Sequence, residues 1–113
     1  MDSILLSIKK LLGIAEDYTI FDSDIIIHIN SAFMILKQLG VGPEEGFSIT
    51  DSTSVWTDFI ADIDKINLVK SYIYLKVRLL FDPPQSGIAV DSLKNQISEF
   101  EWRLNVEVDP KKE

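Results

Sequence analysis

The chain has 113 residues, of which 46% are hydrophobic and 26% are charged, and its formal net charge is −7 at pH 7. This length and composition predict one globular domain that buries roughly two-thirds of its unfolded surface, and they exclude a mainly disordered protein. The negative charge disfavours charge-driven binding to DNA or anionic lipid, and the absence of cysteine excludes disulfides and thiolate metal sites.

The N-terminal segment predicts a short amphipathic helix that begins after Ser3 and ends near Leu12. The Ser3 hydroxyl can accept from a free amide of the first turn, and Gly13 suits the left-handed position that follows a helix. Asp2 stands where a signal peptide carries basic residues, and no run reaches the ~20 apolar residues of a membrane span. We therefore expect neither a secretion signal nor a membrane helix.

A second helix is predicted from Asp22 or Ser23, either of which can cap it, to about Leu39, with Gly40 following. Its apolar residues recur at intervals of three and four. The acidic residues before and at its start lack the spacing of a calcium loop, so we interpret them as a helix cap and a solvated loop. These acidic residues are Glu16, Asp17, Asp22 and Asp24.

Residues 40–54 are the main irregular segment, because glycine and proline recur there. Phe47 and Ile49 alternate with polar residues, which permits a short extended piece or a hairpin edge. The polar cluster 51–54 can cap a short helix. The expected buried face of that helix consists of Trp56, Phe59, Ile60 and Ile63.

Residues 64–82 predict the central helix, because their apolar arc is about twice the roughly 100° that a surface helix needs. More than one neighbouring element must cover it, and Pro83 and Pro84 end it. Lys76 lies in the middle of this arc. Its ammonium either reaches water along its methylenes, which is the simpler interpretation, or forms a salt bridge at a subunit interface.

The last helix is predicted from about Val90 to Asn105, with an apolar seam along one side and a Glu99–Arg103 pair one turn apart. The alternating, then charged, residues 106–113 predict a flexible C-terminal arm. The expected fold is therefore all-α. It is a single domain over residues 1–105, with about five helices around the central helix and an irregular loop or short hairpin at 40–54.

The chemistry-bearing residues form no catalytic pattern. The single histidine, His28, lies among polar residues and is expected to be a solvated imidazole, and there is no phosphate-binding glycine loop or metal-binding helix motif. Trp56 and Trp102 are interpreted as core or contact residues and not as base-stacking platforms, because no basic groove accompanies them. We expect no catalytic residue, no cofactor and no metal.

Five helices in so small a domain share little interior, yet most have apolar residues on more than one side. This excess predicts self-association, and a contact between two different surfaces makes a ring when its rotation closes.

Several segments together resemble one family. They are Phe21-Asp22, His28-Ile29-Asn30-Ser31-Ala32-Phe33, Gln38-Leu39-Gly40-Val41-Gly42-Pro43, Tyr72 to Pro84 (YIYLKVRLLFDPP) and Glu101-Trp102-Arg103-Leu104. In combination they are similar to the small head-tail connector, or adaptor, proteins of long-tailed bacteriophages and prophages. The resemblance spans most of the chain, and none of its segments is a catalytic signature.

The resemblance implies a helical structural protein of the virion that is not an enzyme. Copies would form a ring beneath the portal protein, usually twelve-fold in virions although the isolated chain can remain monomeric. The ring would extend the channel through which DNA passes without sequence-specific binding, and it would dock a tail or stopper protein. The implied location is the head-tail interface, and the host bacterial cytoplasm during assembly. Candidate subunit or partner contacts are Phe47, Ile49, Trp56, Lys76, Trp102, Val106 and Val108.

A second hypothesis is a small helical regulator that binds nucleic acid through a helix in the major groove. Its contacts would be Lys37, Lys65, Lys70 and Arg78. Such binding weakens steeply with salt, and a chain that does not bind DNA at low salt would eliminate it. An enzyme that uses His28 and nearby acids is a more distant possibility.

Overall fold

The structure is a computed structural model that describes residues 2–108, with side chains up to residue 106, and it contains five helices in that range. They are α1 (Ile4–Leu12), α2 (Asp22–Gln38), α3 (Trp56–Phe59), α4 (Ile63–Phe81) and α5 (Gly87–Val108). The described part of the chain has no strand, and its only β-type pairing is an isolated bridge between Ser3 and Val55. The predicted all-α fold is confirmed.

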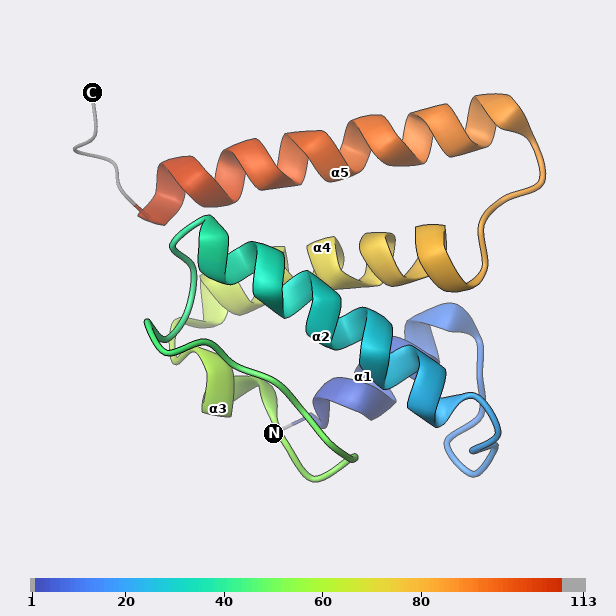
Figure 1. Ribbon diagram of the computed structural model, residues 1–113, viewed down its shortest axis with the longest axis horizontal. Helices are drawn as coiled ribbons and strands as arrows, with labels where there is room; N and C mark the ends of the chain where they lie inside the picture. The colour runs from blue at the N-terminus through green and yellow to red at the C-terminus, as the bar shows by residue number, and fades with distance from the viewer. Residues whose placement is uncertain (1, 109–113) are drawn as a thin grey trace.

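Helix α4 is the centre of the fold, as the width of its apolar arc predicted. It contacts α1, α2 and α5, and it runs antiparallel beside α5 (Figure 1). Asp62 caps its first turn, because the carboxylate accepts from the amide of Asp64 at 3.0 Å. Its residues that are buried beneath these neighbours are Ile66, Val69, Tyr72, Ile73, Leu75 and Val77.

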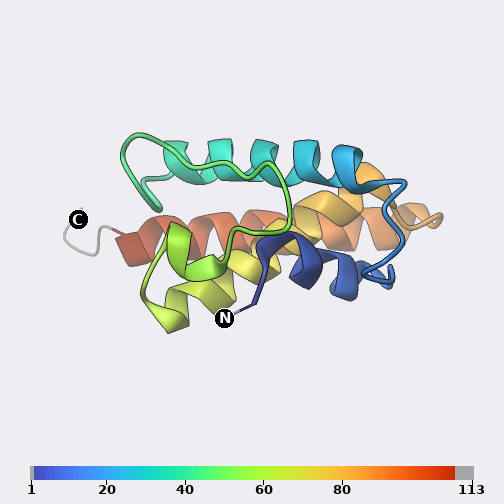
Figure 2. The ribbon, with the colours of Figure 1, turned by 90° about the horizontal axis from the view of Figure 1, so that it is seen from below.

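The molecule measures 44 × 36 × 20 Å along its principal axes. A helix with its side chains is about 10–12 Å across, so the shortest axis accommodates two layers of helices. Seen from below, α2 lies on one side of α4 and α1 on the other (Figure 2). The outer helices therefore bury one side and leave the other side to solvent.

Glycine ends both N-terminal helices as predicted. Gly13 and Gly40 have φ angles of 83° and 85°. The amide after each glycine donates back to the last turn: Ile14 to the Lys9 carbonyl at 2.9 Å, and Val41 to the Leu36 carbonyl at 2.8 Å. These bonds satisfy carbonyls that the end of a helix leaves free.

The predicted cap of α2 is wrong. The capping position is Phe21, which has no side-chain cap, and Asp22 is the first helical residue. The Asp22 carboxylate instead contacts the Lys9 ammonium at 2.8 Å. A buried cation competes successfully for an acid that could otherwise accept from the first-turn amides.

Residues 40–54 form a loop and not a hairpin. The side-chain amide of Asn30 accepts from the Ile49 amide at 2.8 Å and donates to the Ile49 carbonyl at 2.9 Å, so a side chain replaces the partner strand. Phe47 packs against Phe33 and Phe59, with ring centroids 5.0 and 5.3 Å away. The loop is therefore tied to α2 and α3.

Helix α3 buries Trp56 and Phe59 as predicted, but Ile63 is 65% exposed and does not belong to the same face. The reason is that the chain is extended at Ile60, with φ −155° and ψ 140°, so residue 63 begins a new helix. The expectation that residues 56–63 form one continuous buried face is wrong at its last position.

Helix α5 is longer than predicted at both ends. Ser86 starts it, because its hydroxyl accepts from the Ala89 amide at 3.2 Å, and the helix continues to Val108. Residues 106–108 are thus helical and not part of an arm, because no helix breaker precedes Pro110; residues 109–113 of the predicted arm lie outside the described residues. The predicted seam packs on the core with Leu93, Ile97 and Leu104 buried, and the Glu99–Arg103 pair forms at 2.6 Å.

A polar bond crosses the contact between α4 and α5. The buried Tyr72 hydroxyl donates to the Glu101 carboxylate at 2.8 Å. Burial, together with this bond and the negative charge of Glu101, raises the pKa of Tyr72 well above its usual value. The protonated phenol is therefore the form that the fold stabilises.

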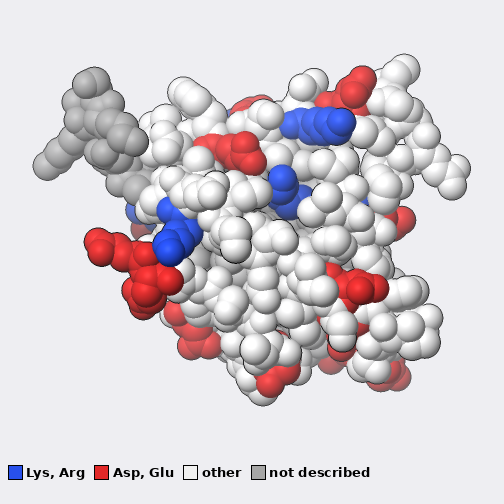
Figure 3. Space-filling view, viewed as in Figure 1, with Lys and Arg blue, Asp and Glu red and all other residues white. Residues whose placement is uncertain are grey.

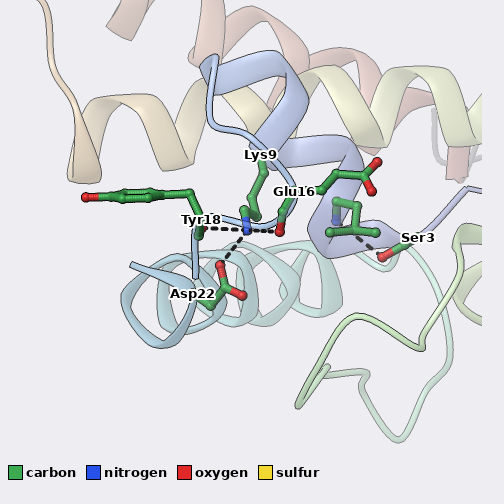
Figure 4. Close-up of polar contacts among 6 residues, drawn as sticks. Ser3, Lys9, Glu16, Tyr18 and Asp22 are labelled. Atoms are coloured by element: carbon green, nitrogen blue, oxygen red, sulfur yellow. Dashed lines mark hydrogen bonds and ion pairs between the residues drawn. The ribbon is translucent and has the colours of Figure 1, made fainter. Parts of the chain in front are cut away.

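Lys9 is the one charged residue that is fully buried in the described structure, with 0% of its surface exposed. Its ammonium donates to the carbonyl of Glu16 at 3.0 Å and to the carbonyl of Tyr18 at 2.9 Å, and it pairs with Asp22 (Figure 4). Asp22 Oδ1 has no other polar partner among the described residues. One cation thus fixes the whole connection between α1 and α2.

Replacing Lys9 with methionine should lower the free energy of unfolding by about 2–4 kcal/mol, because two carbonyls and a carboxylate lose their donor. Lys10→Met is the matched control: the neighbouring lysine is exposed, and its loss should change stability by less than about 0.5 kcal/mol. Urea unfolding of both variants measures the difference. Equal effects would show that the buried ammonium does not hold the loop.

Tyr72→Phe should lower the free energy of unfolding by about 1 kcal/mol at pH 7, because Glu101 loses a donor. The raised pKa of Tyr72 means that its contribution is complete below the unfolded pKa of about 10 and is lost as the pH rises above that value. The stability gap between wild type and variant should therefore shrink in alkaline solution. Urea unfolding at pH 7 and near pH 11 tests this, and a constant gap would refute it.

Candidate interaction surfaces

The residues considered for chemistry do not converge in the described structure. His28 is partly buried and packs against Phe81 with ring centroids 6.4 Å apart, so it is less solvated than predicted. Within the described residues, no group of three or more His, Asp or Glu side chains could hold a metal ion. None of the described helices has both the length and the apolar content that a membrane crossing requires.

Two of the open clefts on the surface of the described structure contain basic side chains. The larger, about 590 Å³, lies beside α1 and contains an ion pair between Lys70 and Asp2 at 3.7 Å. The smaller, about 370 Å³, lies between α4 and α5, and Arg78 on its edge donates to the Tyr74 hydroxyl at 3.3 Å. One basic side chain in each cleft, Lys70 and Arg78, thus already has a partner within the chain.

The structure divides the predicted contact residues into buried and exposed groups. Ile49 and Trp56 are 2% and 1% exposed, and the Trp56 indole donates to the Ser7 hydroxyl at 3.2 Å, so both serve the core. Phe47 is half-buried within its phenylalanine cluster. Trp102 and Val106 are 68% and 44% exposed on α5, and they keep their predicted availability to a partner.

Lys76 is partly buried, and no acidic side chain among the described residues forms an ion pair with it. This position agrees with a methylene stem that lies along apolar surface while the ammonium reaches water. The side chain of Val108 lies outside the described residues.

The outward side of α2 is an uncharged apolar stripe. Ile27 and Met34 are 60% and 65% exposed, and Ser31 lies exposed between them in the sequence. On the face in front of α2, charged side chains gather mainly near the margins and leave a broad uncharged area (Figure 3). We call Ile27, Ser31 and Met34 the α2 stripe.

The outward side of α5 carries a second set of exposed apolar residues, and the exposed Glu99–Arg103 ion pair lies on the same side, beside Trp102. Ile88 and Trp102 are 84% and 68% exposed, fourteen residues or two heptads apart, so they lie on the same side of the helix as Val106. We call Ile88, Trp102 and Val106 the α5 stripe. Because α2 and α5 cover different sides of α4, their outward stripes point in different directions (Figures 1 and 2).

Sequence periodicity missed two features. The first is Lys9, which follows Leu5 by four residues and precedes Leu12 by three, so its spacing already places it on the buried side. The second is a surface aromatic cluster in which Tyr18, Phe21 and Phe81 are in contact, with centroid distances of 5.8 and 5.3 Å. Phe81 is 60 residues from Phe21 in the sequence, so this contact could not be predicted without the three-dimensional structure.

Comparison with protein families gives a match over nearly the whole chain. A family model described as phage connector protein matches residues 4–111, which is nearly the whole chain. No curated protein and no solved structure matches it significantly. The family match agrees with the resemblance seen in the sequence and covers all five helices. The chain belongs to the phage connector protein family.

Proposed function

We propose that the protein is a structural head-tail connector, and the match to the connector family over residues 4–111 carries this proposal. It acts by assembly and has no catalytic turnover. Copies form a ring beneath the portal protein, with twelve subunits in the virion, and the ring docks a tail or stopper protein. The protein is located at the head-tail interface, and in the host cytoplasm before assembly.

The two apolar stripes support a ring. A ring needs two different surfaces on each subunit, so that one surface of a copy contacts the other surface of the next copy. The α2 stripe and the α5 stripe are different surfaces that point in different directions. We assign them to the two sides of the subunit contact, and Trp102 and Val106 are its α5 residues.

The charge supports a passive DNA channel. A chain with a net charge of −7 repels the phosphate backbone, so DNA can move past such subunits without binding to them.

The alternative of a DNA-binding regulator receives no support from the fold. Three of its four proposed contacts, Lys65, Lys70 and Arg78, lie on α4, which is packed against α1, α2 and α5 and cannot enter a major groove. Lys70 and Arg78 also have partners within the chain.

The proposed function predicts assembly with the portal protein encoded by the same phage. Sedimentation of the chain with purified portal should give a complex containing many copies of the chain per portal ring, whether or not the isolated chain is monomeric. A chain that stays monomeric at high concentration and ignores both the portal and the tail-side proteins would contradict the proposal.

The subunit contact is tested with Met34→Asp and Trp102→Asp, each of which places a charge in one stripe. Each variant alone should assemble at least about tenfold more weakly, since a buried unpaired charge opposes association. Mixed together, the two variants retain one intact contact per pair and should form a dimer but no ring.

Thr57→Asp is the control for added charge, because Thr57 is exposed on α3 and outside both stripes. It should assemble as the wild type does. If the mixture of stripe variants forms no dimer, or if each variant alone assembles normally, the assignment of the two stripes is wrong.

A further inference from the structure

A third apolar surface lies where the α1–α2 connection meets the last turn of α4. Tyr18 and Phe21 are 45% and 39% exposed and in mutual contact, and the Phe21 ring contacts the partly buried Phe81 edge-on at 5.3 Å. Ile20 and Leu80, their sequence neighbours, are 72% and 50% exposed. We call these five residues the aromatic patch.

Most of the aromatic patch lies in a loop, and the backbone of this loop is hydrogen-bonded to Lys9. The Tyr18 carbonyl points inward and accepts from the buried Lys9 ammonium, while its ring points away (Figure 4). The same ammonium holds the Glu16 carbonyl and the Asp22 carboxylate on either side. A surface that is already ordered loses little conformational entropy when a partner binds.

The rim of the aromatic patch is acidic. Asp17 precedes Tyr18, Asp24 lies one turn after Phe21, and Asp82 follows Phe81, and all three are exposed. The nearest basic residue along α4 is Arg78, which donates to the Tyr74 hydroxyl. The buried Lys9 is already paired with Asp22.

The apolar centre and the acidic rim of the aromatic patch together determine which kind of partner can bind there. A second copy that presented the same patch would oppose its acidic rim with an identical one, within a pair of chains that each carry −7. DNA is repelled for the same reason. A protein surface that carries an apolar side chain flanked by lysine or arginine is complementary to the patch. Its apolar side chain can pack on the aromatic centre, and its basic residues can pair with the acidic rim.

We propose that the aromatic patch is the docking surface for a different virion protein, which inserts an apolar side chain between flanking basic residues. The inference rests on the proposed connector function. It adds that different surfaces of the subunit bind sister copies and the partner protein. The α2 and α5 stripes bind sister copies, and the acid-rimmed aromatic patch binds the partner.

Ile20→Asp tests the patch against its matched control, Ile63→Asp. Both isoleucines are largely exposed, at 72% and 65%, but Ile63 lies in the first turn of α4, at the end opposite Phe81. Binding of each variant is measured by calorimetry against the purified portal protein and, separately, the tail-side protein of the same phage. Unchanged melting curves would show that both variants fold.

Ile20→Asp should weaken binding to one of these two proteins at least about tenfold, and Ile63→Asp less than about twofold. In Asp17→Asn, the affinity for the same protein should depend less steeply on salt than in the wild type, because a rim carboxylate is lost.

The outcomes separate the two proposals. Wild-type binding that Ile20→Asp leaves intact would overturn the docking surface alone. Loss of self-assembly in Ile20→Asp, with partner binding unchanged, would make a second copy the occupant and would also overturn it. A wild-type chain that binds neither protein would overturn the connector function together with this inference.

Discussion

The limited thickness of the helical bundle determines how much apolar surface the chain can hide. Two layers of helices fill its 20 Å axis, so α4 is the helix with neighbours on three sides while α2 and α5 each keep an outward side. Side chains such as Met34 and Trp102 consequently remain more than 60% exposed. In a chain with a net charge of −7, the uncharged α2 stripe opposes the approach of another acidic surface less than the charged parts of the molecule do.

Irregular segments in this fold are fixed by single side chains that reach out from helices. Lys9 of α1 satisfies two carbonyls of the first connection, and Asn30 of α2 satisfies both backbone groups of Ile49 in the second. Buried backbone groups need hydrogen-bond partners, and in these irregular segments no helix or strand supplies them, so the side chains do. They also make the connections stiff enough to present side chains in a defined arrangement.

Much of the fold could be predicted from local pattern. The helix ends at Gly13 and Gly40, the central position of α4 and the seam of α5 all follow from spacing and from the conformational needs of glycine and proline. The prediction failed where a distant partner decides the outcome. Asp22 pairs with a cation thirteen residues away instead of capping its helix. For residues 40–54 the sequence left a loop or a short hairpin open, and the bonds from Asn30 to Ile49 favour the loop.

The candidate site was less accessible to sequence reasoning than the fold. An apolar pattern identifies side chains that burial would stabilise. It does not show which of them are buried within the chain and which remain exposed. Trp56 and Trp102 look alike in sequence, yet one is 1% exposed in the core and the other 68% exposed on α5. The aromatic patch joins residues 18–21 to residues 80–81, a contact that only the packing of α2 on α4 creates.

Electron cryomicroscopy of the head-tail junction in intact virions would test the connector role most directly. We expect a ring of helical subunits beneath the portal, into which α4 and its three neighbouring helices fit without rearrangement, with the α2 stripe of each copy against the α5 stripe of the next. A junction that contains no such subunit, in virions whose genome encodes this chain, would contradict the role.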